Sequence, residues 1–271
     1  MLRSIAVVVA LAAVTASSSA TAQVVFAVTE GVTYQATPKE IREKFEPLAE
    51  VIGKALRREV RIVLVPGYDD ARAGLAKQEY DLAYIHPAHV ALAEIKAGRY
   101  RTLVWTAGFT EYTVSLLVKP DSTMKTLDDI KGRTLVTPDP DSITAWMVRA
   151  MLRTGKIGEK DLRVRTTRYQ DAVPFYLDYD FADVGATAAN SVVKTWTGKG
   201  GKVALKSRSL PIKHVIASTK LSNEEMDRVR EALIALANTD AGRKQLAIIG
   251  YKGFQAPNAE IEQTTIAWLG L

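Results

Sequence analysis

The chain of 271 residues contains no cysteine. Disulfides, thiolate metal sites, cysteine nucleophiles and a lipidated N-terminal cysteine are therefore excluded. The motifs G-x-S-x-G and H-E-x-x-H and a glycine-rich phosphate loop are also missing, so we expect no enzyme, no catalytic residues and no cofactor. Histidine is scarce: there are three, and two of them lie in the segment His86-Pro-Ala-His89.

An apolar run near the N-terminus is too short to span a bilayer. It covers residues 5–14, follows Arg3, and is succeeded by small residues that end in Ala20-Thr21-Ala22. A basic start, an apolar stretch and an A-x-A end are typical of a cleaved secretory signal. We therefore predict that residues 1–22 are a signal peptide and that the mature chain begins at Gln23 in the periplasm. A membrane anchor is the alternative.

The chain has no long block of charge of one sign. Lys and Arg number 36 against 30 Asp and Glu, which gives a formal charge of +6, and the basic residues occur in short mixed clusters. Such clusters are typical of solvated faces, so we expect no nucleic-acid partner. The balance favours a small anionic ligand, and we take a monomer as the default.

Short runs rich in Val, Ile, Leu and Ala alternate with amphipathic segments of helical length. This alternation predicts an α/β fold in which helices cover both faces of a sheet. Two such blocks and a C-terminal return indicate two lobes, each a mixed sheet flanked by helices, with two hinge crossovers. We expect lobe I at 23–112 plus 212–271, lobe II at 113–211, and crossovers near 112–118 and 207–215.

In such a fold the ligand lies between the lobes, where strands end and helices begin. Ser142 and Thr144 open a predicted helix and could hold an anion, or simply cap the helix. Tyr112 begins a crossover strand, where its hydroxyl could donate a hydrogen bond to an anion, or its ring could simply pack in the hinge. Tyr34 and Gln35, which follow the first strand, could instead be loop-tip residues in solvent. Tyr84 and His86 end the third strand.

His86 and His89 suggest a metal site as an alternative, with His214, an Asp or a Glu as a further ligand. Histidines three apart on a helix share a face and could bind zinc, copper or nickel. His86 precedes Pro87, however, so we expect it to lie before the helix in extended geometry. The pair would then lack ideal helical spacing.

Most of the large aromatic residues are expected in the core by default. They are Trp105, Phe109, Trp146, Phe175, Tyr176, Tyr179, Phe181 and Trp196.

Several short motifs follow one another in a fixed order along the chain. They are Phe45-Glu-Pro-Leu48, Asp81-Leu-Ala-Tyr84-Ile-His86-Pro87, Leu127-Asp-Asp-Ile-Lys131-Gly132, Asp139-Pro-Asp-Ser142 and Phe181-Ala-Asp-Val-Gly185. In this order the chain resembles the periplasmic substrate-binding proteins of ABC importers for phosphonate, phosphite and phosphate. The resemblance implies a type II periplasmic binding protein fold that closes on an oxyanion and delivers it to a membrane permease. A membrane sensor kinase is the alternative partner.

The chain departs from the family pattern at three places. Thr144 and Ala145 replace the second Ser and the Gly of Ser-x-Ser-Gly, and Gln170 stands where many members carry His before Asp171. Asp171 could pair with a ligand amine or cap a helix, and Thr187 is a comparable loop position. His86 stands where the family usually carries a small residue. A histidine with a pKa of about 6.5 gains a positive charge as pH falls, so we expect anion binding to strengthen at lower pH.

Overall fold

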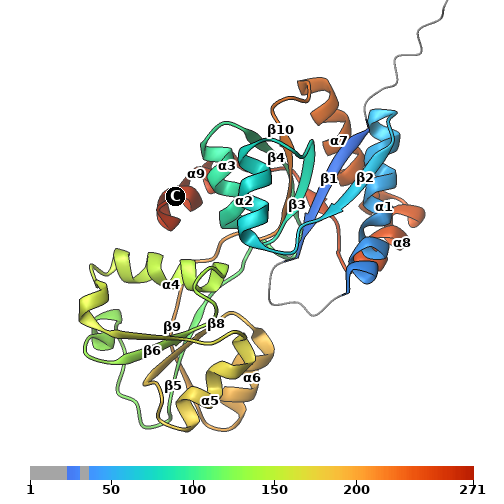
Figure 1. Cartoon of the computed structure of the whole chain (residues 1–271). Helices are drawn as coiled ribbons and strands as arrows, with labels where there is room; N and C mark the ends of the chain where they lie inside the picture. Colours follow the sequence, from blue (N-terminus) through green and yellow to red (C-terminus); the bar gives the residue numbers. More distant parts are fainter. Residues whose placement is uncertain (1–22, 31–36) are drawn as a thin grey trace, which may run out of the picture.

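The computed structural model describes residues 23–30 and 37–271. The predicted signal peptide at 1–22 and the candidates Tyr34 and Gln35 lie outside these residues. Within the described ranges, no helix has the length and apolar character needed to cross a bilayer. The described chain forms two lobes, one above the other in Figure 1, and two extended segments join them.

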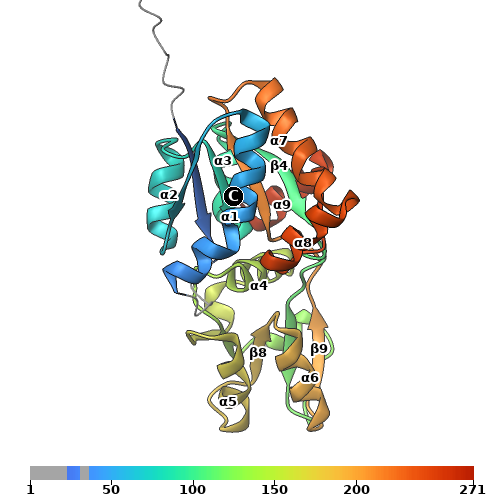
Figure 2. The ribbon, with the colours of Figure 1, turned by 90° about the vertical axis from the view of Figure 1, so that its right-hand side faces the viewer.

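Lobe I is built on a sheet of six strands in the order β11-β4-β10-β3-β1-β2. β1 is parallel to β2 and β3, whereas β10 runs antiparallel to β3 and β4, so the sheet is mixed. The strands are β1 (Val24–Thr29), β2 (Val60–Leu64), β3 (Leu82–Ile85), β4 (Tyr100–Thr106), β10 (His214–Ser218) and β11 (Phe254–Gln255). Helices α1 (Pro38–Leu56), α7 (Asn223–Ala235) and α8 (Asp240–Ile249) cover one face, and α2 (Tyr68–Ala76) and α3 (Ala88–Lys96) the other (Figure 2).

The first helix shows how the sequence specifies these elements. The Thr37 side chain accepts a hydrogen bond from the Glu40 amide, and Glu40 accepts one from the Thr37 amide, which completes a capping box. Phe45, Leu48 and Ile52 recur at helical spacing and are fully buried against the sheet. Burying each of these side chains stabilises the fold by about 1.5–3 kcal/mol. This helix is one of the amphipathic segments that the sequence predicts.

Lobe II contains a second mixed sheet in the order β7-β6-β8-β5-β9. β6 is parallel to β7 and β8, and β5 is antiparallel to β8 and β9. The strands are β5 (Ser115–Val118), β6 (Thr134–Thr137), β7 (Arg163–Thr166), β8 (Val184–Thr187) and β9 (Lys202–Lys206). Helix α4 (Ile143–Thr154) covers one face, and α5 (Val173–Asp178) and α6 (Asn190–Gly198) cover the other.

The lobes are joined through residues 107–114 and 207–213, which run side by side. Tyr112 and Leu210 exchange backbone hydrogen bonds with N to O distances of 3.1 and 3.0 Å. The C-terminal helix α9 (Ala259–Leu269) packs against α3 of lobe I and α4 of lobe II. The predicted α/β architecture of two mixed sheets with two crossovers is confirmed.

The prediction that the large aromatic residues are mostly core is wrong on one surface of lobe II. Phe175, Tyr179 and Phe181 have exposed fractions of 50, 63 and 46 %. The short helix α5 buries Val173 and Leu177, four residues apart, so Phe175 between them points outward. The exposed rings pack on each other instead, with 4.6 Å between the ring centroids of Phe175 and Tyr179.

Candidate functional site

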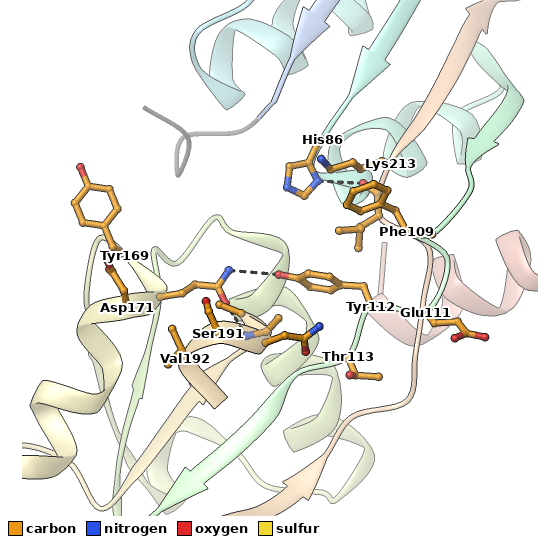
Figure 3. A pocket seen from close by; sticks show the side chains of 16 residues that line it. His86, Phe109, Glu111, Tyr112, Thr113, Tyr169, Asp171, Ser191, Val192 and Lys213 are labelled. Atoms are coloured by element: carbon orange, nitrogen blue, oxygen red, sulfur yellow. Dashed lines mark hydrogen bonds between the residues drawn. The ribbon is translucent and has the colours of Figure 1, made fainter. Parts of the chain in front are cut away.

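A cavity of about 710 Å³ lies between the lobes, beside the two crossovers (Figure 3). Lobe I contributes His86 from the end of β3, and the crossovers contribute Tyr112 and Lys213. Lobe II contributes Asp171 and the start of α6. The cavity therefore combines side chains from distant parts of the chain, as expected where strands end and helices begin.

Lys213 is the buried cation of this cavity. Only 4 % of the residue is exposed, and its Nζ lies 4.2 Å from the centroid of the Phe109 ring. Burial lowers the pKa of Lys213 to about 8; the nearby Glu30 raises it and Lys44 lowers it, but burial dominates. At neutral pH the ammonium is still mainly protonated. Its weak hydration makes it a strong partner for an anion.

His86 lies next to Lys213 and is neutral. Burial, and then the charge of Lys213, lower its pKa to about 3. Its Nδ1 lies 3.2 Å from the carbonyl oxygen of Ile212, so the neutral ring carries its proton on Nδ1 and donates it to that oxygen. The predicted titration of His86 near pH 6.5 is therefore contradicted.

A chain of hydrogen bonds crosses the floor of the cavity in lobe II. The hydroxyl oxygens of Tyr112 and Thr144 are 3.0 Å apart, and the Gln170 side-chain amide donates to the Tyr112 oxygen over 3.4 Å. The Gln170 carbonyl oxygen accepts from the Thr187 hydroxyl at 3.1 Å and from the Ala188 amide at 2.6 Å. Three predicted site residues are thus brought together by Gln170. In the sequence, Gln170 was noted only because it stands where many family members carry a histidine, and this gave no sign of its role in the hydrogen-bond chain.

The N-terminus of α6 opens onto the same cavity. Asn190, Ser191 and Val192 line it, and the preceding residue, Ala189, provides no side-chain cap. The amides of a first helical turn have no intrahelical acceptor and carry the positive end of the helix dipole. The sequence analysis missed this feature, because it considered Thr187 only as a loop position. The Thr187 hydroxyl accepts a hydrogen bond from the Ala189 amide at 3.2 Å, but α6 begins only at Asn190, so the amides of its first turn keep no side-chain cap.

Ser142 and Tyr84 do not line the cavity. Ser142 is buried and caps α4 by accepting a hydrogen bond from the Ala145 amide at 3.2 Å. Tyr84 is fully buried in lobe I, where its ring centroid is 4.7 Å from that of Phe45 and its hydroxyl contacts Tyr251. Side chains alternate along a strand, so Tyr84 points toward α1 while the end of the strand reaches the cavity.

The N-terminus of α4 instead contacts lobe I through Asp141. Its carboxylate accepts hydrogen bonds from Arg72 of α2 and, over 3.4 Å, from Nε2 of His89 in α3. Partial burial raises the pKa of Asp141, but the hydrogen bonds from His89 and Arg72 outweigh burial and hold the pKa well below its usual range. The His89 ring also stacks on Trp146 with 5.0 Å between centroids. His89 is therefore an interlobe contact.

Asp171 and Glu111 are the acidic side chains that line the cavity. Asp171 belongs to the 3-10 turn at Gln170–Ala172 that precedes α5, and Figure 3 shows it on the lobe II side. His86 and His89 have separate partners, a backbone carbonyl and Asp141. In the part of the chain that the structure describes, no three His, Asp or Glu side chains gather as a metal site would require.

Comparison with known proteins gives a family and several structural relatives. A family model described as "ABC transporter, phosphonate, periplasmic substrate-binding protein" matches residues 31–260. XAC2383 from Xanthomonas citri bound to ATP has a TM-score of 0.75 at 15 % identity, covering 92 % of this chain and 97 % of that one. PhnD1 from Prochlorococcus marinus in complex with methylphosphonate has a TM-score of 0.65 at 13 % identity, covering 91 and 96 % of the two chains.

A binding protein component of an ABC phosphonate transporter (PA3383) from Pseudomonas aeruginosa has a TM-score of 0.59 at 16 % identity, covering 92 and 94 %. No curated protein matches the chain. At these identities the solved structures show a shared fold, and the expected type II periplasmic binding protein architecture is confirmed.

Proposed function

The chain belongs to the family of periplasmic substrate-binding proteins of phosphonate ABC transporters, and we propose that it binds a small oxyanion, such as a phosphonate, phosphite or phosphate, in the interlobe cavity. Proteins of this family bind a solute for import, together with an ABC permease, and are not enzymes. We also propose that residues 1–22 direct the chain to the periplasm, where the family acts.

The observation that carries the proposal is the pairing of Lys213 with the open start of α6. In Figure 3, Lys213 and His86 lie on one side of the cavity, and Ser191 and Val192 lie on the other. An ammonium and a set of helix amides across a cavity favour a group with several negatively charged oxygens. An oxyanion between them would contact both lobes and so stabilise the closed arrangement.

The two acidic residues limit which anions fit. Asp171 and Glu111 line the same cavity and would repel a negative group placed near them. An anion held at Lys213 could extend a neutral or cationic group toward Asp171. The volume of about 710 Å³ leaves room for such a group, so organic phosphonates and phosphates belong in the ligand panel beside the inorganic ions.

Thermal-shift titration followed by calorimetry tests the proposal. The panel contains methylphosphonate, 2-aminoethylphosphonate, phosphite, phosphate, sulfate and ATP, which one structural relative holds. A ligand present at 100 times its Kd should stabilise the protein by about 2.7 kcal/mol. Zinc is included because of the histidine alternative.

The matched variants are Lys213→Met and Lys244→Met, the second being an exposed lysine on α8 outside the cavity. The proposal requires at least one oxyanion to bind the wild type and the Lys244→Met variant alike, and to bind Lys213→Met much more weakly. Flat melting curves across the whole panel would refute it.

A further inference from the structure

Lobe II contains a second cavity, on the outside of the molecule. It lies between α4 and the strands β6 and β7, measures about 660 Å³, and shares no lining residue with the interlobe cavity. In Figure 1, α4 lies on the side of the lobe II sheet that faces away from α5 and α6. The volume of this second cavity falls within the range of roughly 300–1,000 Å³ that small-molecule sites occupy. We call it the α4 groove.

The floor of the α4 groove is apolar. Leu135 of β6, Val148 and Leu152 of α4, and Leu162 line it. Each belongs to the lobe II core and is buried. The groove stays open because β7 is the edge strand of the sheet, where all four side chains are exposed and Val164 is 51 % exposed. Val164 therefore supplies exposed apolar surface at the groove, against which an alkyl chain could lie without displacing a core side chain.

The rim of the α4 groove is basic. Arg149 and Arg153, one turn apart on α4, and Lys156 beyond its end line the groove, and among the side chains that the structure describes no acidic one does. Arg149 lies 4.8 Å over the Trp146 ring, and Arg153 donates a hydrogen bond to the Trp268 carbonyl. Within the described residues, no carboxylate forms an ion pair with Arg153 or Lys156.

Asp161 lies beside the groove but does not line it. Asp161 lies on the 3-10 turn at Glu159–Asp161, and its carboxylate accepts a hydrogen bond from the Gly158 amide at 2.8 Å. The charged side chains described in the lining of the groove are therefore basic, and a ligand with an apolar body and an anionic head complements them.

We propose that the α4 groove binds an amphipathic small anion, an alkyl carboxylate of medium chain length. Its chain lies against Leu152 and Val164, and its carboxylate lies at the rim, near Arg153 and Lys156. This site is separate from the interlobe cavity and does not depend on the function proposed for it.

Calorimetric titration with octanoate, decanoate and dodecanoate, each below its micelle concentration, tests the proposal. We expect one site, and an affinity that rises roughly three- to fourfold for each added methylene group, as burial of the chain requires. Decyltrimethylammonium, which has the same chain and the opposite charge, should not bind measurably.

Two variants locate the site without altering the core. Lys156→Glu should weaken decanoate binding by roughly three- to tenfold, because it replaces an attraction with a repulsion at the rim. Val164→Asp, on the exposed edge strand, should weaken it at least as much. Lys160→Glu, an exposed charge change outside the groove, and Lys213→Met, in the interlobe cavity, are the matched controls and should leave binding unchanged.

Three results would overturn the proposal. The first is the absence of decanoate binding, and the second is equal binding by wild type, Lys156→Glu and Val164→Asp. The third is loss of binding in Lys213→Met, which would place the alkyl chain in the interlobe cavity. An acidic amphipathic peptide that binds the groove while decanoate does not would assign it to a protein partner instead.

Discussion

Replacing Lys213 by methionine should stabilise the unliganded protein and weaken its anion binding. Methionine keeps an unbranched side chain of similar length that can pack on the Phe109 ring, while the charge that lies over this ring is removed. The carboxylate of Glu30, which lies near Lys213, retains its ion pair with Lys44 at 2.6 Å. The substitution therefore removes one buried charge together with its cation–π contacts to Phe109 and Tyr251.

The size of the stabilisation follows from the pKa shift. Lys213 has a pKa lowered from 10.5 to about 8 in the folded protein, and this difference corresponds to about 3 kcal/mol at 1.36 kcal/mol per unit. Below pH 8 the lysine is charged in both the folded and the unfolded chain, so the full penalty for burying the charge applies. Between pH 8 and 10.5 only the unfolded chain binds the proton, and the penalty shrinks as pH rises.

Urea unfolding at several pH values measures this effect. At pH 7 the free energy of unfolding of Lys213→Met should exceed that of the wild type by up to about 3 kcal/mol, and the difference should decrease between pH 8 and 10.5. Lys244→Met, exposed on α8, should change stability by less than about 0.5 kcal/mol. A Lys213→Met variant that is no more stable than wild type at pH 7 would refute the electrostatic reasoning.

The same charge should make oxyanion binding depend on pH. If only protonated Lys213 binds the anion, a pKa of about 8 predicts a roughly tenfold loss of affinity between pH 7 and pH 9. The ratio of the wild-type Kd to that of Lys213→Arg at each pH removes the titration of the ligand itself, because arginine stays charged. A ratio that does not change between pH 7 and 9 would contradict the role of Lys213.

Three further predictions concern the neighbouring contacts. Tyr112→Phe removes the hydroxyl between Thr144 and Gln170 and should cost about 1 kcal/mol of stability, measured by urea unfolding, because two partly buried hydrogen bonds are lost. Between pH 5 and 7, the oxyanion affinity of wild type and of His86→Gln, measured by calorimetry, should change with pH in the same way, since His86 has a pKa of about 3 and stays neutral over this range. Asp141→Asn weakens the contacts of α4 with α2 and α3, so small-angle scattering should show a larger radius of gyration.

The sequence predicted the elements, because they depend on local chemistry: α1 has its own cap and apolar stripe. Tyr112, expected at the cleft, does line the cavity, whereas Thr187 at the end of β8 is buried beneath it, and the ligand-binding role of both stays a prediction. Tyr84 was misplaced, since the strand at 82–85 is apolar throughout and its residue types do not indicate which face meets the cleft.

The features that the sequence did not predict depend on tertiary structure. Nothing beside Lys213 marks it as a cavity residue, because its burial comes from Phe109 and Tyr251, which lie far away in the chain. The neutral state of His86 depends on the same burial. Phe175 was expected in the core on residue type, whereas the length of α5 decides which of its side chains are covered.

The C-terminal helix α9 makes the two lobes share a core. Leu269 belongs to the same buried cluster as Ala88 and Leu92 of α3 and Met147 of α4. Any motion that opens the interlobe cavity must then either carry α9 with one lobe and expose the apolar surface it leaves, or turn about α9 as a fixed pivot. Turning about α9 keeps Leu269 covered on both sides, so we expect α9 to act as a pivot beside the two crossovers.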